Sequence, residues 1–321
     1  MNKNVVFMFS GQGAQYYRMA EELYKKYDRF AYWMDHCNEM AAPYVGNPLT
    51  EVIYEGGGKS EPFDRLLYTN PALLCVQYSL AQVLLEEGVK PDYLLGYSLG
   101  EIVASVVARA ISLESGIELV TGLARLVEDK TPPAEMLAIM APFPIVSTQP
   151  AMFRSCWVTG KNMVDNFVVC GEPETIRNLC VSLKKQTIAF QKLPVKFGFH
   201  TEMIDPIEGD FRRLVKRIEP GELEIPVISA YQKKTVTTFG ADYLWNVIRC
   251  PVDFEATVKQ TLRMDDFLFI DAGPSGVLAT LVKYLLPADA GSVSLQMINQ
   301  FGNDMHTFRT LMQNLNAERV Y

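Results

Sequence analysis

Short apolar runs alternate with amphipathic stretches along the first third of the chain. Residues 5–9 form a continuous apolar run, which is typical of a strand buried on both faces of a parallel sheet. A helical pattern begins near Tyr17, and residues 71–87 have apolar positions at helical spacing. A turn leads into a second apolar run at residues 93–95, and residues 102–108 again have a helical pattern. The alternation predicts a doubly wound α/β core, in which ligands bind at the carboxyl ends of the parallel strands.

The pattern changes after about residue 130. The elements expected there are three strands, at residues 137–140, 167–171 and 189–193, and one helix, at residues 172–185. The order strand, strand, helix, strand predicts a small α+β subdomain inserted into the core. We expect this subdomain to comprise residues 131–198.

The first pattern returns after the insertion. Residues 224–229 and 267–271 are further apolar runs, and residues 277–285 have a helical pattern. The large core is therefore expected to combine residues 1–130 with residues 199–321. The predicted fold class is α/β, with a parallel sheet in the core.

The composition is that of a globular protein. Of the 321 residues, 49% are hydrophobic and 21% are charged. The net charge of −7, with no stripe of Lys and Arg, argues against binding to nucleic acid or to an anionic membrane. We see no signal peptide and no apolar run long enough to cross a bilayer, so we expect a cytoplasmic protein. Without a heptad pattern or an extra apolar helix, we expect a monomer.

The cysteines give no sign of cross-links or metal binding. All six lie apart, without paired spacing and mostly among apolar residues. This pattern indicates reduced thiols and neither a disulfide framework nor a zinc site. No metal and no cofactor are expected.

The segment Gly96-Tyr97-Ser98-Leu99-Gly100 joins the second predicted strand to the helix that follows. This Gly-x-Ser-x-Gly arrangement, between strand and helix, is typical of a nucleophile elbow that holds a serine hydroxyl outward. The start of the helix also places backbone N–H groups beside the serine, where they stabilise a developing oxyanion. A structural serine in a turn is the alternative, and the strand before the motif favours the nucleophile.

A nucleophilic serine needs a base, and the chain has three histidines. His36 lies in a polar helical stretch and His306 in the last predicted helix, so both are expected to be solvated. His200 follows an apolar segment with a glycine, directly after the insertion. A neutral imidazole there is suited to accept the serine proton and return it, although a structural hydrogen bond is the alternative role.

An ordered series of motifs resembles the malonyl-CoA:acyl carrier protein transacylases and the acyltransferase domains of polyketide synthases. The motifs are Gly-Gln-Gly-Ala-Gln at residues 11–15, Thr-Asn-Pro-Ala at residues 69–72, the elbow with Glu101, the segment ending in His200, and Asp-Ala-Gly-Pro at residues 271–274. The resemblance covers nearly the whole chain. It implies a hydrolase-like α/β core with a ferredoxin-like inserted subdomain, and a Ser98–His200 dyad.

The resemblance also implies roles for four further residues. The backbone N–H groups of Gln12 and Leu99 would form the oxyanion hole. A backbone carbonyl in the turn at residues 251–254, that of Asp253 by position, would orient the imidazole. Asn162 stands where the family has an asparagine of the small subdomain facing the active site.

Departures from the family pattern bear on the substrate. Tyr97 stands where the family has histidine, and Leu123 aligns with the arginine that pairs with the carboxylate of malonyl groups. Arg125 is two residues further along a helix, about 200° round its axis, and should point away. Arg125 and Arg18 are the two side chains that could supply a positive charge in place of the family's arginine. Phe199 resembles the aromatic residue of malonyl-selecting members.

Three functions are compatible with this pattern. The first is hydrolysis of monocarboxylic acyl groups, such as acetyl, from acyl carrier protein, as in the freestanding proofreading hydrolases that also lack the arginine. The second is transfer of an acyl group from coenzyme A to acyl carrier protein. The third is a catalytically silent scaffold for carrier proteins, which the intact motifs disfavour. The loss of the arginine favours the hydrolase, with acyl-phosphopantetheine as substrate and acyl carrier protein as partner.

Overall fold

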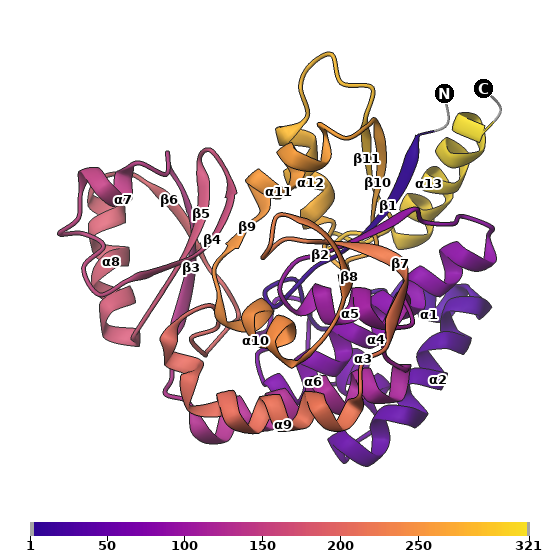
Figure 1. The fold of residues 1–321 in the computed structure, drawn as a ribbon, viewed down its shortest axis with the longest axis horizontal. Helices are drawn as coiled ribbons and strands as arrows, with labels where there is room; N and C mark the ends of the chain where they lie inside the picture. The colour runs from indigo at the N-terminus through magenta and orange to yellow at the C-terminus, as the bar shows by residue number, and fades with distance from the viewer. Residues whose placement is uncertain (1–2, 320–321) are drawn as a thin grey trace.

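Two β-sheets organise the chain, and the computed structural model describes residues 3–319 (Figure 1). Residues 1, 2, 320 and 321 of the expected large core lie outside this range. The larger sheet has the strand order β11 (Val293–Gln296), β10 (Phe267–Asp271), β1 (Asn4–Phe9), β2 (Tyr93–Gly96), β7 (Glu222–Ser229) and β8 (Lys234–Thr238). The first five strands are parallel and β8 is antiparallel to β7. This arrangement confirms the predicted α/β core.

Helices cover both faces of the larger sheet. They are α1 (Glu21–Lys26), α2 (Asp28–Val45), α3 (Leu49–Glu55), α4 (Leu66–Glu86), α5 (Leu99–Val107), α6 (Leu113–Lys130), α9 (Glu208–Ile218), α10 (Ala241–Arg249), α11 (Phe254–Thr261), α12 (Val277–Leu285) and α13 (Asp304–Arg319), with the 3₁₀ helix η1 (Glu202–Ile207). Side chains of a strand alternate between its two faces. In β1, Phe7 and Phe9 therefore pack with α2, α4 and α5, and Val6 and Met8 pack with α11 and α12. The continuous apolar run of β1 reflects burial on both sides.

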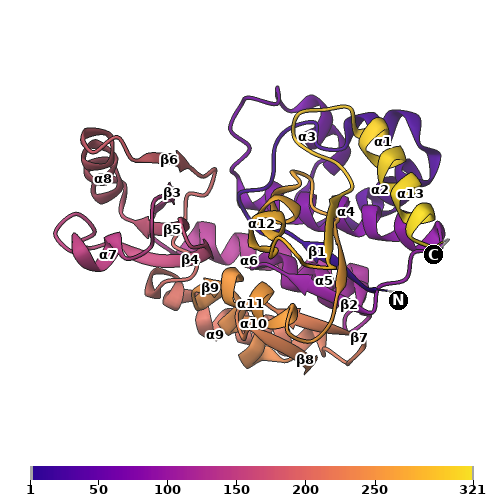
Figure 2. The same cartoon turned by 90° about the horizontal axis from the view of Figure 1, so that it is seen from above.

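The smaller sheet has the strand order β6 (Ala189–Lys192), β3 (Glu135–Met140), β5 (Asn166–Gly171), β4 (Trp157–Met163) and β9 (Val252–Asp253). Its first four strands are antiparallel, and α7 (Ile145–Thr148) and α8 (Pro173–Lys185) complete the strand–helix–strand–strand–helix–strand order of a ferredoxin-like unit. The two views place α8 on the side away from the larger sheet (Figures 1 and 2). The fold class predicted for the insertion is thus confirmed.

Two strands of the smaller sheet differ from the expectation. The sequence pattern predicts no strand at β4, because Gly160, Lys161 and Asn162 interrupt its apolar residues. In the structure, β4 pairs with β5 with two register shifts. The last strand, β9, comes from the chain about 60 residues after β6 and pairs in parallel with β4. The smaller sheet is therefore closed at this edge by a segment outside the predicted insertion.

Two helix starts also differ from the predictions. The helix expected near Tyr17 begins at Glu21, because Arg18 and Ala20 both adopt left-handed backbone conformations, with φ of 64° and 58°. Helix α4 begins at Leu66, five residues before the predicted start at Pro71, which lies inside the helix. Proline favours the first helical turn, which explains the predicted position.

Even the longest helix contains buried polar residues. The longest, α4, carries buried side chains on most of its circumference and still contains polar Asn70 and Gln77. Within the part of the chain that the structure describes, no helix combines the length and the apolar character needed to cross a membrane.

The turn between β2 and α5 is built by close approach of backbone atoms. A Cβ atom added at Gly100 would lie 2.0 Å from the carbonyl oxygen of Phe9, at the end of β1. One added at Gly96 would lie 2.4 Å from Cα of Glu101. These distances are far below any normal contact, so only glycine lets α5 start so near the sheet.

We predict that Gly100→Ala lowers the free energy of unfolding by more than about 3 kcal/mol, because the new methyl group can be accommodated only by moving α5 off β1. Gly209→Ala is the matched control, since Gly209 is also the second residue of its helix and its Cβ would meet only Arg213 at 3.6 Å. The control should be neutral or stabilising by up to about 1 kcal/mol. Urea denaturation measures both, and equal values for the two variants would contradict the close-approach argument.

Candidate active site

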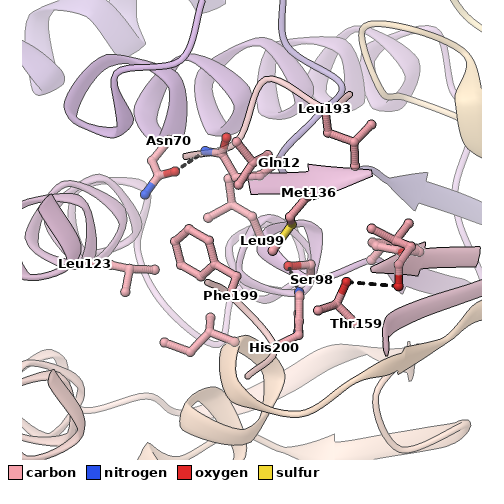
Figure 3. Close-up of a pocket in the computed structure, with 14 residues that line it drawn as sticks. Gln12, Asn70, Ser98, Leu99, Leu123, Met136, Thr159, Leu193, Phe199 and His200 are labelled. Carbon is pink, nitrogen blue, oxygen red and sulfur yellow. Dashed lines mark hydrogen bonds between the residues drawn. The ribbon is translucent and has the colours of Figure 1, made fainter. Parts of the chain in front are cut away.

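Ser98 occupies the turn between β2 and α5, with φ of 56° and ψ of −121°. A left-handed conformation is unfavourable for serine and persists only where the surroundings impose it. Here the close contacts of Gly96 and Gly100 impose it, and the hydroxyl is directed into a cavity (Figure 3). The backbone therefore has the form predicted for a nucleophile elbow.

The imidazole of His200 lies against this hydroxyl. Its Nε2 is 2.8 Å from Oγ of Ser98 (Figure 3). Its Nδ1 is 2.7 Å from the carbonyl oxygen of Cys250. A carbonyl oxygen can only accept, so Nδ1 carries the proton and Nε2 of the neutral ring is free to accept from Ser98. The structure thus brings the two predicted residues together, in the tautomer that suits a base.

The backbone carbonyl that orients the imidazole is not the predicted one. The expected carbonyl was that of Asp253, three residues later. The carbonyl oxygen of Asp253 instead accepts from the hydroxyl of Thr257, and its carboxylate caps α11 by accepting from the N–H of Ala256. Helix α10 ends at Arg249, so the last carbonyls there have no helical partner, and that of Cys250 accepts from the ring of His200.

Burial determines the charge of the imidazole. Because the ring is shielded from solvent, burial lowers the pKa of His200 from 6.5 to about 4, although the hydrogen bond to Cys250 acts in the opposite direction. The ring is therefore neutral at physiological pH. A neutral ring is the form that can accept a proton from Ser98.

Two backbone N–H groups flank the serine. Leu99 is the first residue of α5, and the loop carrying Gln12 passes over Ser98 so closely that a Cβ on Gly11 would lie 2.9 Å from Cβ of Ser98. Among the described residues, neither the N–H of Gln12 nor that of Leu99 donates to an acceptor. Both are thus available to an oxygen beside Ser98, as the prediction for these two residues requires.

The cavity beside Ser98 is small and mostly apolar. It has a volume of about 50 Å³, which corresponds to roughly three to five water molecules. Its lining residues are Gln12, Asn70, Tyr97, Ser98, Leu99, Leu123, Met136, Thr159, Val168, Leu193, Val195, Phe199, His200 and Ile248. Leu123 and Phe199 belong to this lining, as predicted, and no Arg or Lys does.

The amide side chains of the lining are engaged with each other. Gln12 donates from Nε2 to Oδ1 of Asn70 (Figure 3). It also donates to the hydroxyl of Thr69 at 3.2 Å. Asn70 in turn donates to the carbonyl oxygen of Val120 at 3.0 Å. Both donors of the Gln12 amide are thus engaged, and one of the two donors of Asn70 is held by the backbone of α6.

The two arginines that could replace the missing cation lie elsewhere. The guanidinium of Arg125 donates to the carbonyl oxygen of Tyr44 on α2, on the outer side of α6. Arg18 is half exposed and lies 3.4 Å from the carbonyl oxygen of Gly57. The predicted rotation of Arg125 away from position 123 is confirmed.

The residues Tyr97 and Asn162 differ in their relation to the cavity. Tyr97 lines it, whereas Asn162 does not belong to the lining and instead accepts from the hydroxyl of Tyr97 at 3.0 Å. The expected direct contact of Asn162 with substrate is thus replaced by a contact with Tyr97.

The smaller sheet contributes three residues to the lining that no sequence motif marks: Met136, Thr159 and Val168.

Glu101, the residue that ends the elbow motif, is a fully buried carboxyl group. It accepts from the N–H of Tyr231 at 3.1 Å and from the hydroxyl of Tyr243 on α10. Burial raises its pKa to about 7, while these hydrogen bonds act to lower it. The carboxyl group links α5, which carries Ser98, to α10, which ends beside His200.

Known proteins resemble the chain along its whole length. It is 33% identical to the polyketide biosynthesis acyltransferase homolog PksD of Bacillus subtilis (strain 168), over 100% of this chain and 99% of the relative. It is 34% identical to the homolog BaeD of Bacillus velezensis, over 98% of this chain and 96% of the relative.

Solved structures show the same fold. The acyltransferase domain from module 8 of the salinomycin polyketide synthase is 26% identical, with a TM-score of 0.86 over 96% of this chain and 74% of that chain. The malonyl CoA-acyl carrier protein transacylase from Clostridium perfringens shares the fold at 21% identity, with a TM-score of 0.81 over 99% of this chain and 98% of that chain. Residues 6–320 match the acyl transferase domain family, and the chain belongs to that family.

Proposed function

We propose that the protein acts in polyketide biosynthesis and hydrolyses non-carboxylated acyl groups, such as acetyl, from acyl carrier protein. The observation that carries this proposal is the apolar acyl cavity, in which Leu123 lies buried and to which no Arg or Lys contributes. The relatives PksD and BaeD, both named polyketide biosynthesis acyltransferase homologs, support the biosynthetic setting.

The chemistry proceeds through an acyl-enzyme. Oγ of Ser98 attacks the thioester carbonyl carbon while its proton passes to Nε2 of His200, and the N–H groups of Gln12 and Leu99 stabilise the oxyanion. The carbon–sulfur bond then breaks, and the thiol of phosphopantetheine leaves with the proton from His200. Water attacks the ester on Ser98 in the second half-reaction, again losing a proton to His200, and releases the carboxylic acid and free Ser98.

The cavity disfavours a second carboxylate on the acyl group. Burying an unpaired carboxylate among Leu123, Phe199 and Ile248 costs several kcal/mol, because no cationic side chain of the lining compensates for its lost hydration. The amide of Gln12 already donates to Thr69 and Asn70, and a neutral amide does not supply the positive charge that a carboxylate pairs with. A short uncharged acyl group has no ionic hydration to lose on entering this site.

Acyl transfer to a second carrier thiol is the other candidate. Ser98 and His200 are each only 8% exposed, and such burial limits the access of water to the acyl-enzyme. Both candidates share the same acyl-enzyme and differ in what resolves it. The measured product separates them: free acid supports hydrolysis, and an acylated second carrier protein supports transfer.

The first prediction concerns the two reacting residues. Ser98→Ala should give no acyl adduct with acetyl-acyl carrier protein, and His200→Ala should acylate at least about 10³-fold more slowly, because the hydroxyl has lost its base. Ser105→Ala, which removes a hydroxyl bonded to the carbonyl of Ile102 in the same helix, is the matched control and should retain the adduct. Intact-protein mass spectrometry measures all three, and an adduct on Ser98→Ala would contradict the assignment.

The second prediction concerns substrate charge. Acetyl-acyl carrier protein should be processed at least about tenfold better than malonyl-acyl carrier protein, since a lost charge-assisted pair corresponds to about 1.5–3 kcal/mol. Leu123→Arg should narrow or reverse the preference by supplying the charge inside the cavity. Leu126→Arg, on the outer side of the same helix, should leave it unchanged. A wild-type protein that prefers malonyl groups would refute the substrate assignment.

The third prediction concerns pH. Because burial lowers the pKa of His200 to about 4, the ring stays neutral well below pH 6.5. At pH 5.5 the single-turnover acylation rate should therefore remain above about nine-tenths of its value at pH 7.5, whereas an ordinary histidine would leave about one-tenth. In the same range, between about pH 4 and pH 6.5, this group makes the free energy of unfolding rise with pH, because only the unfolded state binds the proton. If the acylation rate instead falls by half near pH 6.5, the pKa of His200 is that of a solvated imidazole and the prediction is wrong.

A further inference from the structure

Tyr97 connects the nucleophile turn to the smaller sheet. Its hydroxyl donates to Oδ1 of Asn162 at 3.0 Å, and Asn162 donates to Asn166 at 2.8 Å across the β4–β5 hairpin. A Cβ atom added at Gly160, also on β4, would lie only 2.6 Å from the same hydroxyl oxygen. The side chain therefore extends from the residue beside Ser98 to the backbone of β4.

The ring of Tyr97 forms a wall of the acyl cavity. It belongs to the cavity lining, and behind it stands Phe254, whose ring centroid lies 5.8 Å away. Burial of the side chain also raises the pKa of its hydroxyl well above the ordinary value. One side of the ring thus meets the cavity, and its hydroxyl end meets β4.

The space behind this wall is bounded by β4, which contributes the amide of Asn162 at the hydroxyl end of the ring, and by Phe254. Gly160 contributes only backbone, and Phe254 offers an apolar surface. If the ring of Tyr97 were absent, the cavity would extend toward the apolar ring of Phe254 and the backbone of Gly160. Such a space accepts a longer hydrocarbon chain and gains free energy with each methylene group buried.

We propose that Tyr97 sets the upper limit on acyl chain length by closing the cavity at β4, with Gly160 providing the room for its hydroxyl. The inference rests on the proposed function and names its substrate class more closely: short unbranched acyl groups, whose far end would meet the ring of Tyr97 in the cavity lining.

The test compares acylation of Ser98 by carrier proteins loaded with acetyl, butyryl, hexanoyl and octanoyl groups. In Tyr97→Ala and Tyr97→Leu, the rate with octanoyl relative to acetyl should rise at least about tenfold, as expected from two or more newly buried methylene groups. Tyr97→Phe keeps the ring and should keep the wild-type order of chain lengths, with a lower Tm from the lost bond to Asn162. Tyr93→Leu is the matched control, because Tyr93 is the first residue of β2, the strand that leads to Tyr97, and packs against Phe267.

A second measurement tests the contact with Gly160. Gly160→Ala should lower Tm in the presence of Tyr97, since the new methyl group meets the hydroxyl, and should have little effect in the Tyr97→Ala background. An equal loss in both backgrounds would show that Tyr97 does not abut β4 and would overturn the proposal.

The outcomes separate this inference from the function on which it rests. An acyl adduct whose chain-length order is the same in wild type, Tyr97→Ala and Tyr97→Leu overturns the role of Tyr97 and leaves the proposed function standing. The absence of an adduct with every chain length overturns both.

Discussion

The active site depends on how closely the first turn of α5 approaches the end of β1. Gly100 lies so near the carbonyl oxygen of Phe9 that the chain must enter the helix through a left-handed residue, and that residue is Ser98. The same turn leaves the N–H of Leu99 without an intrahelical acceptor. The conformation of the nucleophile and one expected oxyanion donor thus follow from a single steric condition.

This turn also contributes to the position of the base. Glu101 follows Gly100 and binds Tyr243 on α10 and the backbone of Tyr231. Helix α10 ends at Arg249, next to Cys250, and the backbone carbonyls of Ile248 and Cys250 accept from the N–H and the ring of His200. A buried carboxyl group therefore joins the element that carries the serine to the element that orients the histidine. The orientation of His200 relative to Ser98 is thus held by backbone carbonyls, without a third side chain bonded to the imidazole.

Much of this site could be predicted from local sequence, and the rest depends on contacts between distant segments. Ser98 and His200 stand in recognisable surroundings. The family resemblance placed Leu123 in the cavity, and helical geometry then placed Arg125 outside it. The carbonyl of Cys250 carries no side-chain signal, and its role arises only because α10 ends there. Likewise, Met136, Thr159 and Val168 reach the cavity because the smaller sheet packs beside the turn, and this packing has no counterpart in any motif. Asn162 was expected to face substrate, but the larger Tyr97 stands in its way and accounts for the difference.

The short strand β9 has a consequence for attempts to exchange parts between members of this family. It pairs with β4 through Gly160 and Lys161, although it follows the histidine segment by about 50 residues. A chimaera that replaces only the continuous stretch around residues 131–198 would combine a foreign β4 with the native β9. The foreign β4 would then have to pair with β9 in the native register, two residues from Cys250. A shift in this register would displace the carbonyl that holds His200. Recombination of this family is therefore safest when the crossover points enclose both segments, so that the seam falls in exposed loops.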